Sequence, residues 1–342
     1  MPVLSDSIIT DAFAGKRVMI TGGLGFIGSN LARRLVTMDC RVTLVDSLIP
    51  QYGGNVHNIH GIENRVQVNI ADVRDPYSIG YLIQGQHYLF NLAGQSSHLD
   101  SMTDPFTDLE INCRAQLSIL EAALKRNPEV KIIFASTRQV YGRPKYLPVD
   151  EQHLLAPVDV NGINKAAGEF YHLLYNNVYH IRSCVLRMTN TYGPRMRVQD
   201  ARQTFLGLWI KLLIEGSPFD VWGGEQLRDF TYVDDAIEAL LIAAVSDEAN
   251  GKIFNLGGLR PIALTDLAQL LVELNGDGNY RVVPFPASSK IIDIGDYYSN
   301  YKYIESMLGW TPRVSEREGL NRTLAFYRLH LDKYLGNEVG RR

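Results

Sequence analysis

The sequence is poor in cysteine and has no long apolar run. Its 342 residues include three cysteines, at positions 40, 113 and 184, without the spacing of a zinc or redox site, so we predict neither a bound metal nor a disulfide. No stretch approaches the roughly 18 apolar residues of a membrane helix, and a signal-peptide pattern is missing. The formal net charge of −3 gives no reason to expect nucleic acid or a membrane surface as a partner. We therefore expect a cytoplasmic globular protein.

The most informative stretch is residues 17–30. Residues 17–21 have the pattern of a buried strand and residues 29–37 that of a helix, with Gly22, Gly25 and Gly28 between them. Glycines at this spacing let the backbone turn sharply and approach a pyrophosphate, which the helix N-terminus stabilises. A second strand, 41–45, ends at Asp46, whose carboxylate would accept a hydrogen bond from a ribose hydroxyl and repel a 2′-phosphate. This order predicts a site for NAD in preference to NADP.

Strand-like segments alternate with helical patterns along the chain, which predicts an α/β fold with a parallel sheet covered by helices. Polar residues follow several of these strands. Asp72, after the strand 66–70, could bind adenine or could cap the next helix. Small residues after the strand 88–94 suit a loop near the nicotinamide, and His98 in that loop is more often a hydrogen-bonding residue than a catalyst.

Several separated motifs occur in a characteristic order. They are Thr21-Gly-Gly-Leu-Gly-Phe-Ile-Gly28, Asn91-Leu-Ala-Gly94, Ser136-Thr-x-x-Val-Tyr-Gly142, Arg228-Asp-Phe-x-Tyr-Val-x-Asp235 and Leu308-Gly-Trp-x-Pro312. Together they resemble the extended short-chain dehydrogenase/reductase family, specifically its nucleotide-sugar epimerases and dehydratases of the UDP-glucose 4-epimerase type. The similarity extends over most of the chain, from about residue 16 to residue 312.

This resemblance implies a Rossmann-type doubly wound sheet and a smaller C-terminal lobe. Residues 1–188 would form the NAD-binding domain, to which 228–258 return. Residues 189–227 and 259–342 would form the lobe that binds a nucleotide-diphosphate sugar. Helices over 108–126 and 161–178 correspond to those with which family members form a four-helix interface, so a homodimer is expected.

The resemblance also implies roles for individual residues. Thr137 would hydrogen-bond the sugar hydroxyl that is oxidised, and Lys165 would bind the nicotinamide ribose. The other expected cofactor contacts are Gly22, Gly25, Phe26, Ile27, Gly28, Asp46, Asp72, Val73, Leu92, Ala93 and Gly94. The expected substrate contacts are Ser96, Thr137, Asn190, Arg228 and Lys290, of which Asn190, Arg228 and Lys290 would bind the diphosphate.

One position departs from the family pattern. The catalytic tyrosine of the family lies four residues before the lysine, and Asn161 stands there in this chain. An amide can position a hydroxyl but cannot accept its proton, and losing a general base costs roughly 10²–10⁴-fold in rate. Lys165 is the nearest substitute if burial lowers its pKa, and Tyr141 and His98 are weaker candidates.

The segment after Ser136 bears on the reaction. Dehydratases of the family usually carry Asp-Glu after the hydroxyl residue and decarboxylases a Glu, whereas this chain has Arg138-Gln139. Because these carboxylates are absent, the sequence favours NAD-dependent epimerisation through a transient keto-sugar. Arg138 could recognise an acidic or phosphorylated substituent or could be a solvated surface residue. Two alternatives stay open: a dehydratase, decarboxylase or reductase with atypical acid–base groups, and a catalytically impaired protein that binds NAD or a sugar nucleotide.

Overall fold

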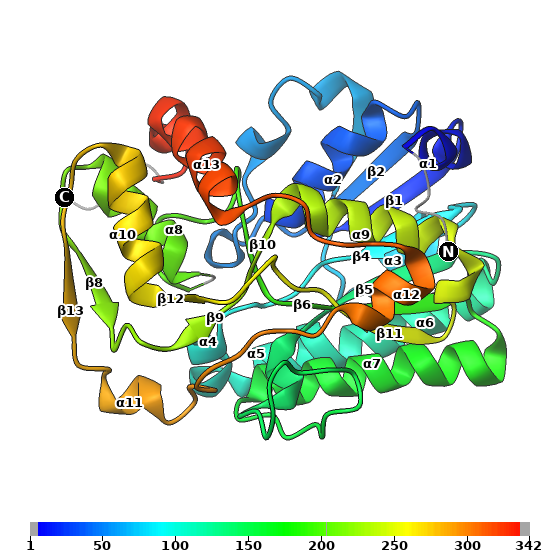
Figure 1. Ribbon diagram of the computed structural model, residues 1–342. Coiled ribbons are helices and arrows are strands. Elements are labelled where there is room, and N and C mark those ends of the chain that lie inside the picture. The colour runs from blue at the N-terminus through cyan, green and yellow to red at the C-terminus, as the bar shows by residue number, and fades with distance from the viewer. Residues whose placement is uncertain (1–5, 203, 336–342) are drawn as a thin grey trace.

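The computed structural model describes residues 6–202 and 204–335, and at its centre lies a parallel sheet of seven strands (Figure 1). The strand order is β11-β6-β5-β4-β1-β2-β3. The direction of winding reverses at β1, from which the chain builds the sheet first to one side and then to the other. This is the order of a doubly wound Rossmann sheet, so the predicted fold is confirmed. The strands are β1 Arg17–Thr21, β2 Arg41–Asp46, β3 Val66–Ile70, β4 Tyr88–Asn91, β5 Lys131–Thr137, β6 Ser183–Met188 and β11 Lys252–Asn255.

The central strand β1 shows why these segments form a buried parallel sheet. It pairs in parallel with β2 and β4, with Val18 opposite Val42 and Tyr88. Val18 and Ile20 enter the hydrophobic cluster on one face, and Met19 enters the cluster on the other. Strands covered on both faces need an almost continuous apolar run, which is the pattern that the sequence has here.

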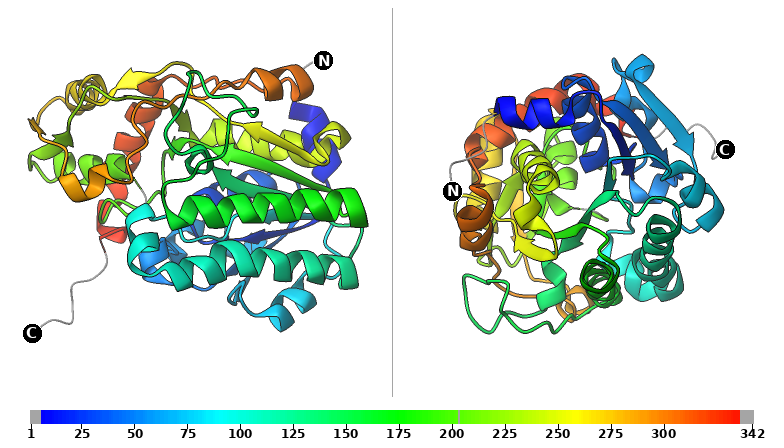
Figure 2. Two further views of the ribbon diagram at one scale, coloured as in Figure 1. Left: turned by 90° about the horizontal axis from the view of Figure 1, so that it is seen from below. Right: turned by 90° about the vertical axis from the view of Figure 1, so that its right-hand side faces the viewer.

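Helices cover both faces of the sheet (Figure 2). On one face, α2 and α1 pack against α9, and on the other α3 and α7 pack against α6. The bounds are α1 Asp6–Phe13, α2 Phe26–Val36, α3 Pro76–Leu82, α6 Ala115–Arg126, α7 Val160–Tyr179 and α9 Val233–Val245. Before α6 the chain forms α4 His98–Thr103, α5 Pro105–Leu109 and a π-helical turn, Glu110–Arg114. Two boundaries therefore differ from prediction: α2 begins at Phe26, and the predicted helix 108–126 is the end of α5, the π-helical turn and α6.

A smaller lobe lies at one end of the sheet, at the left of Figure 1. The chain enters it after β7 and returns through β10 to α9 and β11, where β11 pairs with β6. Within the lobe, β8 pairs with β13 in parallel and β9 with β12 antiparallel. The elements are β7 Asn190–Tyr192, α8 Phe205–Ile214, β8 Phe219–Trp222, β9 Leu227–Arg228, β10 Phe230–Tyr232, β12 Ile262–Ala263, α10 Leu264–Asn275, β13 Tyr280–Val283, α11 Ala287–Lys290 and α13 Glu316–His330. The remaining helix, α12 Lys302–Leu308, lies outside the lobe and packs against β11 of the central sheet (Figure 1).

Short 3-10 turns complete the described chain, at Pro50–Tyr52, Val56–Ile59, Glu63–Arg65, Arg138–Tyr141, Asp247–Ala249 and Leu331–Lys333. Among the helices that the structure describes, none combines the length and the apolar character that crossing a membrane requires.

A buried ion pair joins α7 to β6. Arg187 donates through Nε to Oε1 of Glu169 at 2.9 Å and through Nη2 to Oε2 at 2.5 Å, and both side chains are almost completely buried. Glu169 also accepts a hydrogen bond from Ser136, and Arg187 donates to the hydroxyl of Tyr141. Tyr141 in turn donates to Asn255 at 2.7 Å. Each charged group is therefore satisfied inside the protein, as a buried ion pair requires.

Candidate functional site

A cavity of about 930 Å³ lies between the carboxyl ends of the sheet strands and the smaller lobe. Its walls come from the loops after β1, β2, β3, β4, β5 and β6 and from the lobe segments around β7, α8 and β9. Doubly wound sheets bind their ligands at this edge. Every cofactor and substrate contact predicted from the sequence lines the cavity except Lys290, which is exposed at the end of α11.

The glycine turn forms one end of the cavity. Gly22 has a φ of +67°, and a Cβ there would lie 3.0 Å from the backbone nitrogen of Ala93. A Cβ on Gly28 would lie 2.2 Å from the carbonyl oxygen of Gly22, so the turn and the first turn of α2 can approach each other only without side chains. Gly25 precedes α2, whose N-terminal amides therefore face the cavity edge. A turn of this shape before a helix N-terminus fits a pyrophosphate.

Two carboxylates follow the next strands. Asp46, at the end of β2, accepts hydrogen bonds from the amides of Leu24 and Leu48 at 2.9 Å. Burial raises the pKa of Asp46, and these two hydrogen bonds oppose the shift. Asp72 follows β3, and its ion pair with Arg74 lowers the pKa of Asp72. The residue that caps α3 is Asp75, so the alternative role of Asp72 as a helix cap is wrong.

Thr137 and Lys165 lie at the middle of the cavity. Thr137 is the last residue of β5, and Lys165 projects from α7. The ammonium of Lys165 donates to the carbonyl of Ala135 at 3.0 Å. Burial lowers the pKa of Lys165 to about 8, although the carboxylates of Asp108 and Glu169 act in the opposite direction. A Cβ on Gly94 would lie 3.1 Å from the Lys165 nitrogen, so Gly94 leaves room for the ammonium.

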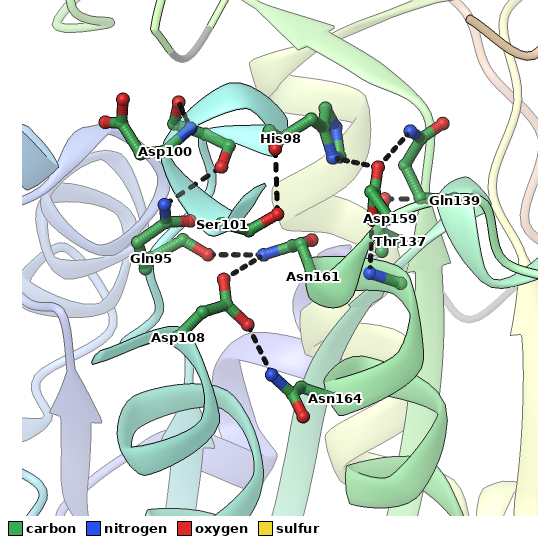
Figure 3. Close-up of polar contacts among 12 residues, drawn as sticks. Gln95, His98, Asp100, Ser101, Asp108, Thr137, Gln139, Asp159, Asn161 and Asn164 are labelled. Atoms are coloured by element: carbon green, nitrogen blue, oxygen red, sulfur yellow. Dashed lines mark hydrogen bonds and ion pairs between the residues drawn. The ribbon is translucent and has the colours of Figure 1, made fainter. Parts of the chain in front are cut away.

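Asn161, four residues before Lys165, is held by the protein (Figure 3). Its amide nitrogen donates to the carbonyl of Gln95 at 2.7 Å and to the carboxylate of Asp108 at 3.1 Å. The fully buried Asp108 also accepts from the amides of Asn112 and Asn164. The asparagine therefore ties α7 to α5 and to the loop after β4. It lines the cavity without supplying a group that could take up a proton.

A histidine–carboxylate pair lies beside this cluster. Nδ1 of His98 is 3.0 Å from a carboxylate oxygen of Asp159, and Figure 3 marks this contact. Asp159 caps α7 by accepting from the amide of Gly162 at 2.7 Å, and it also accepts from the side chain of Gln139 at 2.8 Å. Burial disfavours the Asp159 carboxylate, but these hydrogen bonds and the charge of His98 leave its pKa below the usual value.

Two arginines lie in the wall on the lobe side. Arg228 pairs with Asp293 at 3.0 Å, and burial together with the neighbouring charge of Arg138 lowers the pKa of Arg228 to about 10. Burial also lowers the pKa of Arg138, whose guanidinium lies 5.6 Å from the centre of the Tyr297 ring. The interpretation of Arg138 as a solvated surface residue is therefore wrong. Asn190 lines the same wall and donates to the carbonyl of Asp229 at 2.9 Å.

Tyr141 does not lie at this site. Its ring is completely buried, and its hydroxyl is held by Asn255 and Arg187. Burial raises its pKa far above that of a free tyrosine. The candidacy of Tyr141 as the group that accepts the proton is therefore wrong. In residues 6–202 and 204–335 we find no cluster of three or more His, Cys, Asp or Glu side chains placed to hold a metal ion.

The polar residues that sequence reasoning missed are Asp108 and Asp159. Asp159 carried a local signal, because an Asp just before a helical pattern is a good N-cap. The contact of Asp159 with His98, 61 positions away, has no signal in the local sequence. The same is true of the three asparagine amides that donate to Asp108.

The sequence and the fold of this chain are similar to those of known enzymes that act on nucleotide sugars. A sequence profile described as "NAD dependent epimerase/dehydratase family" matches residues 18–257. The UDP-glucuronic acid decarboxylase 1 of Xenopus tropicalis is 30% identical over 329 residues, covering 94% of this chain and 75% of that protein. The crystal structure of the UDP-glucose 4-epimerase of Thermotoga maritima with UDP-glucose is 30% identical, with a TM-score of 0.82 and 92% and 99% of the two chains covered. An epimerase structure from Methanothermobacter thermautotrophicus is 25% identical, with a TM-score of 0.88 and coverages of 95% and 97%.

Proposed function

This chain belongs to the NAD-dependent epimerase/dehydratase family, and from that premise we propose that it epimerises a nucleotide-diphosphate sugar through a transient keto-sugar. The observation that carries the proposal is the single cavity in which the glycine turn, Thr137 with Lys165, and Arg228 all meet. The named relatives include both epimerases and a decarboxylase of nucleotide sugars, which supports the substrate class. The choice among their reactions rests on the residues of this chain.

The residues present fit NAD. The glycine turn and the N-terminus of α2 would hold the pyrophosphate, Asp46 the adenosine ribose, and Asp72 with Val73 the adenine. Lys165 would hold the nicotinamide ribose, and Leu92, Ala93 and Gly94 would border the same end. NAD, when bound, supplies a hydride acceptor that returns the hydride later in the cycle. Thr137 would hydrogen-bond and orient the sugar hydroxyl that is oxidised.

The residues at positions 138 and 139 favour epimerisation over elimination. Neither Arg138 nor Gln139 is an acid or base suited to removing water. The side-chain amide of Gln139 donates a hydrogen bond to Asp159, so Gln139 has a structural role. A keto-sugar formed here would therefore keep its substituents until the hydride returns.

The lobe side of the cavity supports the binding of a diphosphate. Arg228 and Asn190 would contact it, and Arg138 would add a second positive charge near Arg228. Lys290 is exposed and lies outside the cavity wall, so we assign it no contact with the diphosphate. We retain residues 1–188 with 228–258 as the cofactor domain and the other segments as the sugar-nucleotide lobe.

The test is to incubate the protein with NAD and a panel of UDP-, GDP-, CDP- and dTDP-sugars in deuterated water. Products are read by mass spectrometry and proton NMR. An isomer without deuterium would indicate hydride removal and return at one carbon, and an isomer with deuterium would indicate enolisation beside a keto group. Loss of water or carbon dioxide would replace epimerisation with one of the alternative reactions. Nucleotide-sugar binding without any product would favour the catalytically impaired alternative.

We also propose a homodimer, because α7 carries an uncovered apolar stripe. Ile163, Phe170, Leu174 and Val178 lie on one helical face, and their exposed fractions are 49–57%. Phe106 on the neighbouring α5 is 77% exposed. Apolar side chains in such a continuous arrangement mark an interaction surface more often than isolated ones do.

Replacing both Phe170 and Leu174 by glutamate is expected to give a monomer, because two uncompensated carboxylates per chain would be buried at the interface. The measurement is light scattering after gel filtration, in which the mass falls from twice 38.4 kDa to 38.4 kDa. The matched control is Leu329→Glu, which changes an exposed leucine on α13 and should leave the dimer intact. A wild-type mass of one chain would contradict the proposed dimer.

A further inference from the structure

The His98–Asp159 pair has the geometry of an oriented acid–base group. The Asp159 side chain is fully buried, whereas one third of the His98 side chain is exposed to the cavity. Asp159 is itself fixed by the amide of Gly162 and the side chain of Gln139. The carboxylate therefore cannot turn away, and the imidazole ring that it holds has a defined orientation.

The contact with Asp159 determines which nitrogen of His98 is available. Nδ1 lies 3.0 Å from a carboxylate oxygen of Asp159 without forming a well-aligned hydrogen bond, and a neighbouring carboxylate favours the tautomer in which Nδ1 carries the proton. The other nitrogen, Nε2, is then the acceptor in the neutral ring. Within residues 6–202 and 204–335, no side chain or backbone group forms a hydrogen bond with Nε2. His98 lines the same cavity as Thr137, Asn161 and Lys165, so Nε2 is the nitrogen left for a ligand bound there.

The other groups around the cavity are less suited to carrying the proton. Asn161 is an amide that donates to Gln95 and Asp108. Lys165 donates to the carbonyl of Ala135 at 3.0 Å, so its ammonium already makes a contact with the protein. A protonated lysine can bind a ribose and stabilise negative charge, but it cannot accept a proton.

We propose that His98 is the general base and acid of the reaction proposed above, in the role left open by Asn161. Nε2 would take up the proton of the sugar hydroxyl as the C–O bond becomes a C=O bond. NAD, when bound, would supply the acceptor for the hydride from the same carbon, so that the two electrons lost by the sugar have a destination. On return of the hydride, Nε2–H gives the proton back to the new alkoxide, so that neither a proton nor an electron is lost overall.

Asp159 is the positioning residue of this pair. It keeps Nδ1 protonated and stabilises the positive charge of the imidazole after proton transfer, as a buried carboxylate does for histidine in other enzymes. Because Asp159 also caps α7, the same side chain aligns His98 with the helix that carries Lys165.

The first test compares His98→Asn with wild type. Asparagine keeps a donor for Asp159 but has no nitrogen that can take up a proton. We expect kcat to fall about 10²–10⁴-fold, which is the range for removal of a general base, while KM changes little. The matched control is His60→Asn, which changes another histidine–carboxylate pair, His60 with Glu63, on the surface. That variant should keep wild-type kcat.

Two further readouts separate catalysis from structure. Added imidazole should restore part of the activity of His98→Ala, which a structural role would not produce. Nitrogen-15 NMR of labelled histidine should show wild-type His98 protonated at Nδ1, with its signals assigned by their loss in His98→Asn. In Asp159→Asn this tautomer preference should weaken. A wild-type His98 protonated at Nε2 would overturn the proposal without reference to any substrate.

The outcomes distinguish this proposal from the function on which it rests. If wild type binds NAD and converts no nucleotide sugar, the proposed function fails, and the role of His98 fails with it. If wild type converts a nucleotide sugar and His98→Asn does so at the same rate, only the role of His98 is overturned. Both the proposed function and the role of His98 are supported if His98→Asn is slow but binds the nucleotide sugar with unchanged affinity by calorimetry, and if imidazole restores activity to His98→Ala.

Discussion

Substituting Gly28 by alanine is expected to weaken NAD binding by a factor of ~100 or more. The new Cβ would lie 2.2 Å from the carbonyl oxygen of Gly22 and 2.9 Å from the Cα of Gly23, and both are backbone atoms. The conflict can be relieved only if the glycine turn moves away from α2. Backbone hydrogen bonds to a charged group contribute about 1.5–3 kcal/mol each, so the loss of two of them accounts for the expected factor. Calorimetric titration with NAD measures it directly.

The matched control is Gly80→Ala. Gly80 lies in α3, and a Cβ there would meet nothing within 4 Å. Alanine is the better helix former by about 1 kcal/mol, so this variant should bind NAD normally and be slightly more stable. If Gly28→Ala also bound NAD with wild-type affinity, the pyrophosphate would have to lie elsewhere in the cavity.

The glycine turn and the sheet could be predicted because their signals are local. The strand, the glycines at 22, 25 and 28, the helix and Asp46 follow one another within 30 residues, and each depends on backbone geometry that only a few residue types allow. The parallel sheet likewise follows from apolar strands that alternate with amphipathic helices. Both predictions needed no knowledge of contacts between distant segments.

The polar part of the site could not be predicted in the same way. His98 and Asp159 meet because α4 begins where the loop after β4 passes the N-terminus of α7, which is a property of the assembled fold. Lys290 illustrates the opposite case. Its position in the sequence suggested a phosphate contact, but α11 leaves its side chain exposed and outside the cavity wall. Tyr141 belongs to a motif beside the site, yet its hydroxyl serves the buried ion pair of Arg187.

The hydrogen bonds of Asn161 give this residue a structural role. Its amide joins the carbonyl of Gln95 to the carboxylate of Asp108, so it links the loop that leads to His98 with α5. A tyrosine could not donate two hydrogen bonds from that position. The same side chain that offers no group to take up a proton also fixes the loop before His98, which supports our proposal that His98 carries the proton.

The second large effect concerns stability. Replacing Arg187 by methionine is expected to lower the free energy of unfolding by about 3–5 kcal/mol, because the carboxylate of Glu169 stays buried without its charged partner. Denaturant unfolding measures the change. Glu169 lies one helical turn after Lys165, so the disturbance should also reach Lys165, which we propose binds the nicotinamide ribose. We therefore expect weaker NAD binding in the folded fraction of this variant.

Two companion variants test the electrostatic origin of this loss. Arg187→Met combined with Glu169→Leu removes both charges, and it should recover most of the stability, since replacing a whole buried pair by apolar side chains is often neutral. Arg114→Met breaks an exposed pair with Glu110 and should change stability little, because solvent screens such pairs. If the double variant were no more stable than Arg187→Met alone, the loss would come from packing around β6 and the hydrogen bond to Tyr141, and the unpaired Glu169 carboxylate would not be its cause.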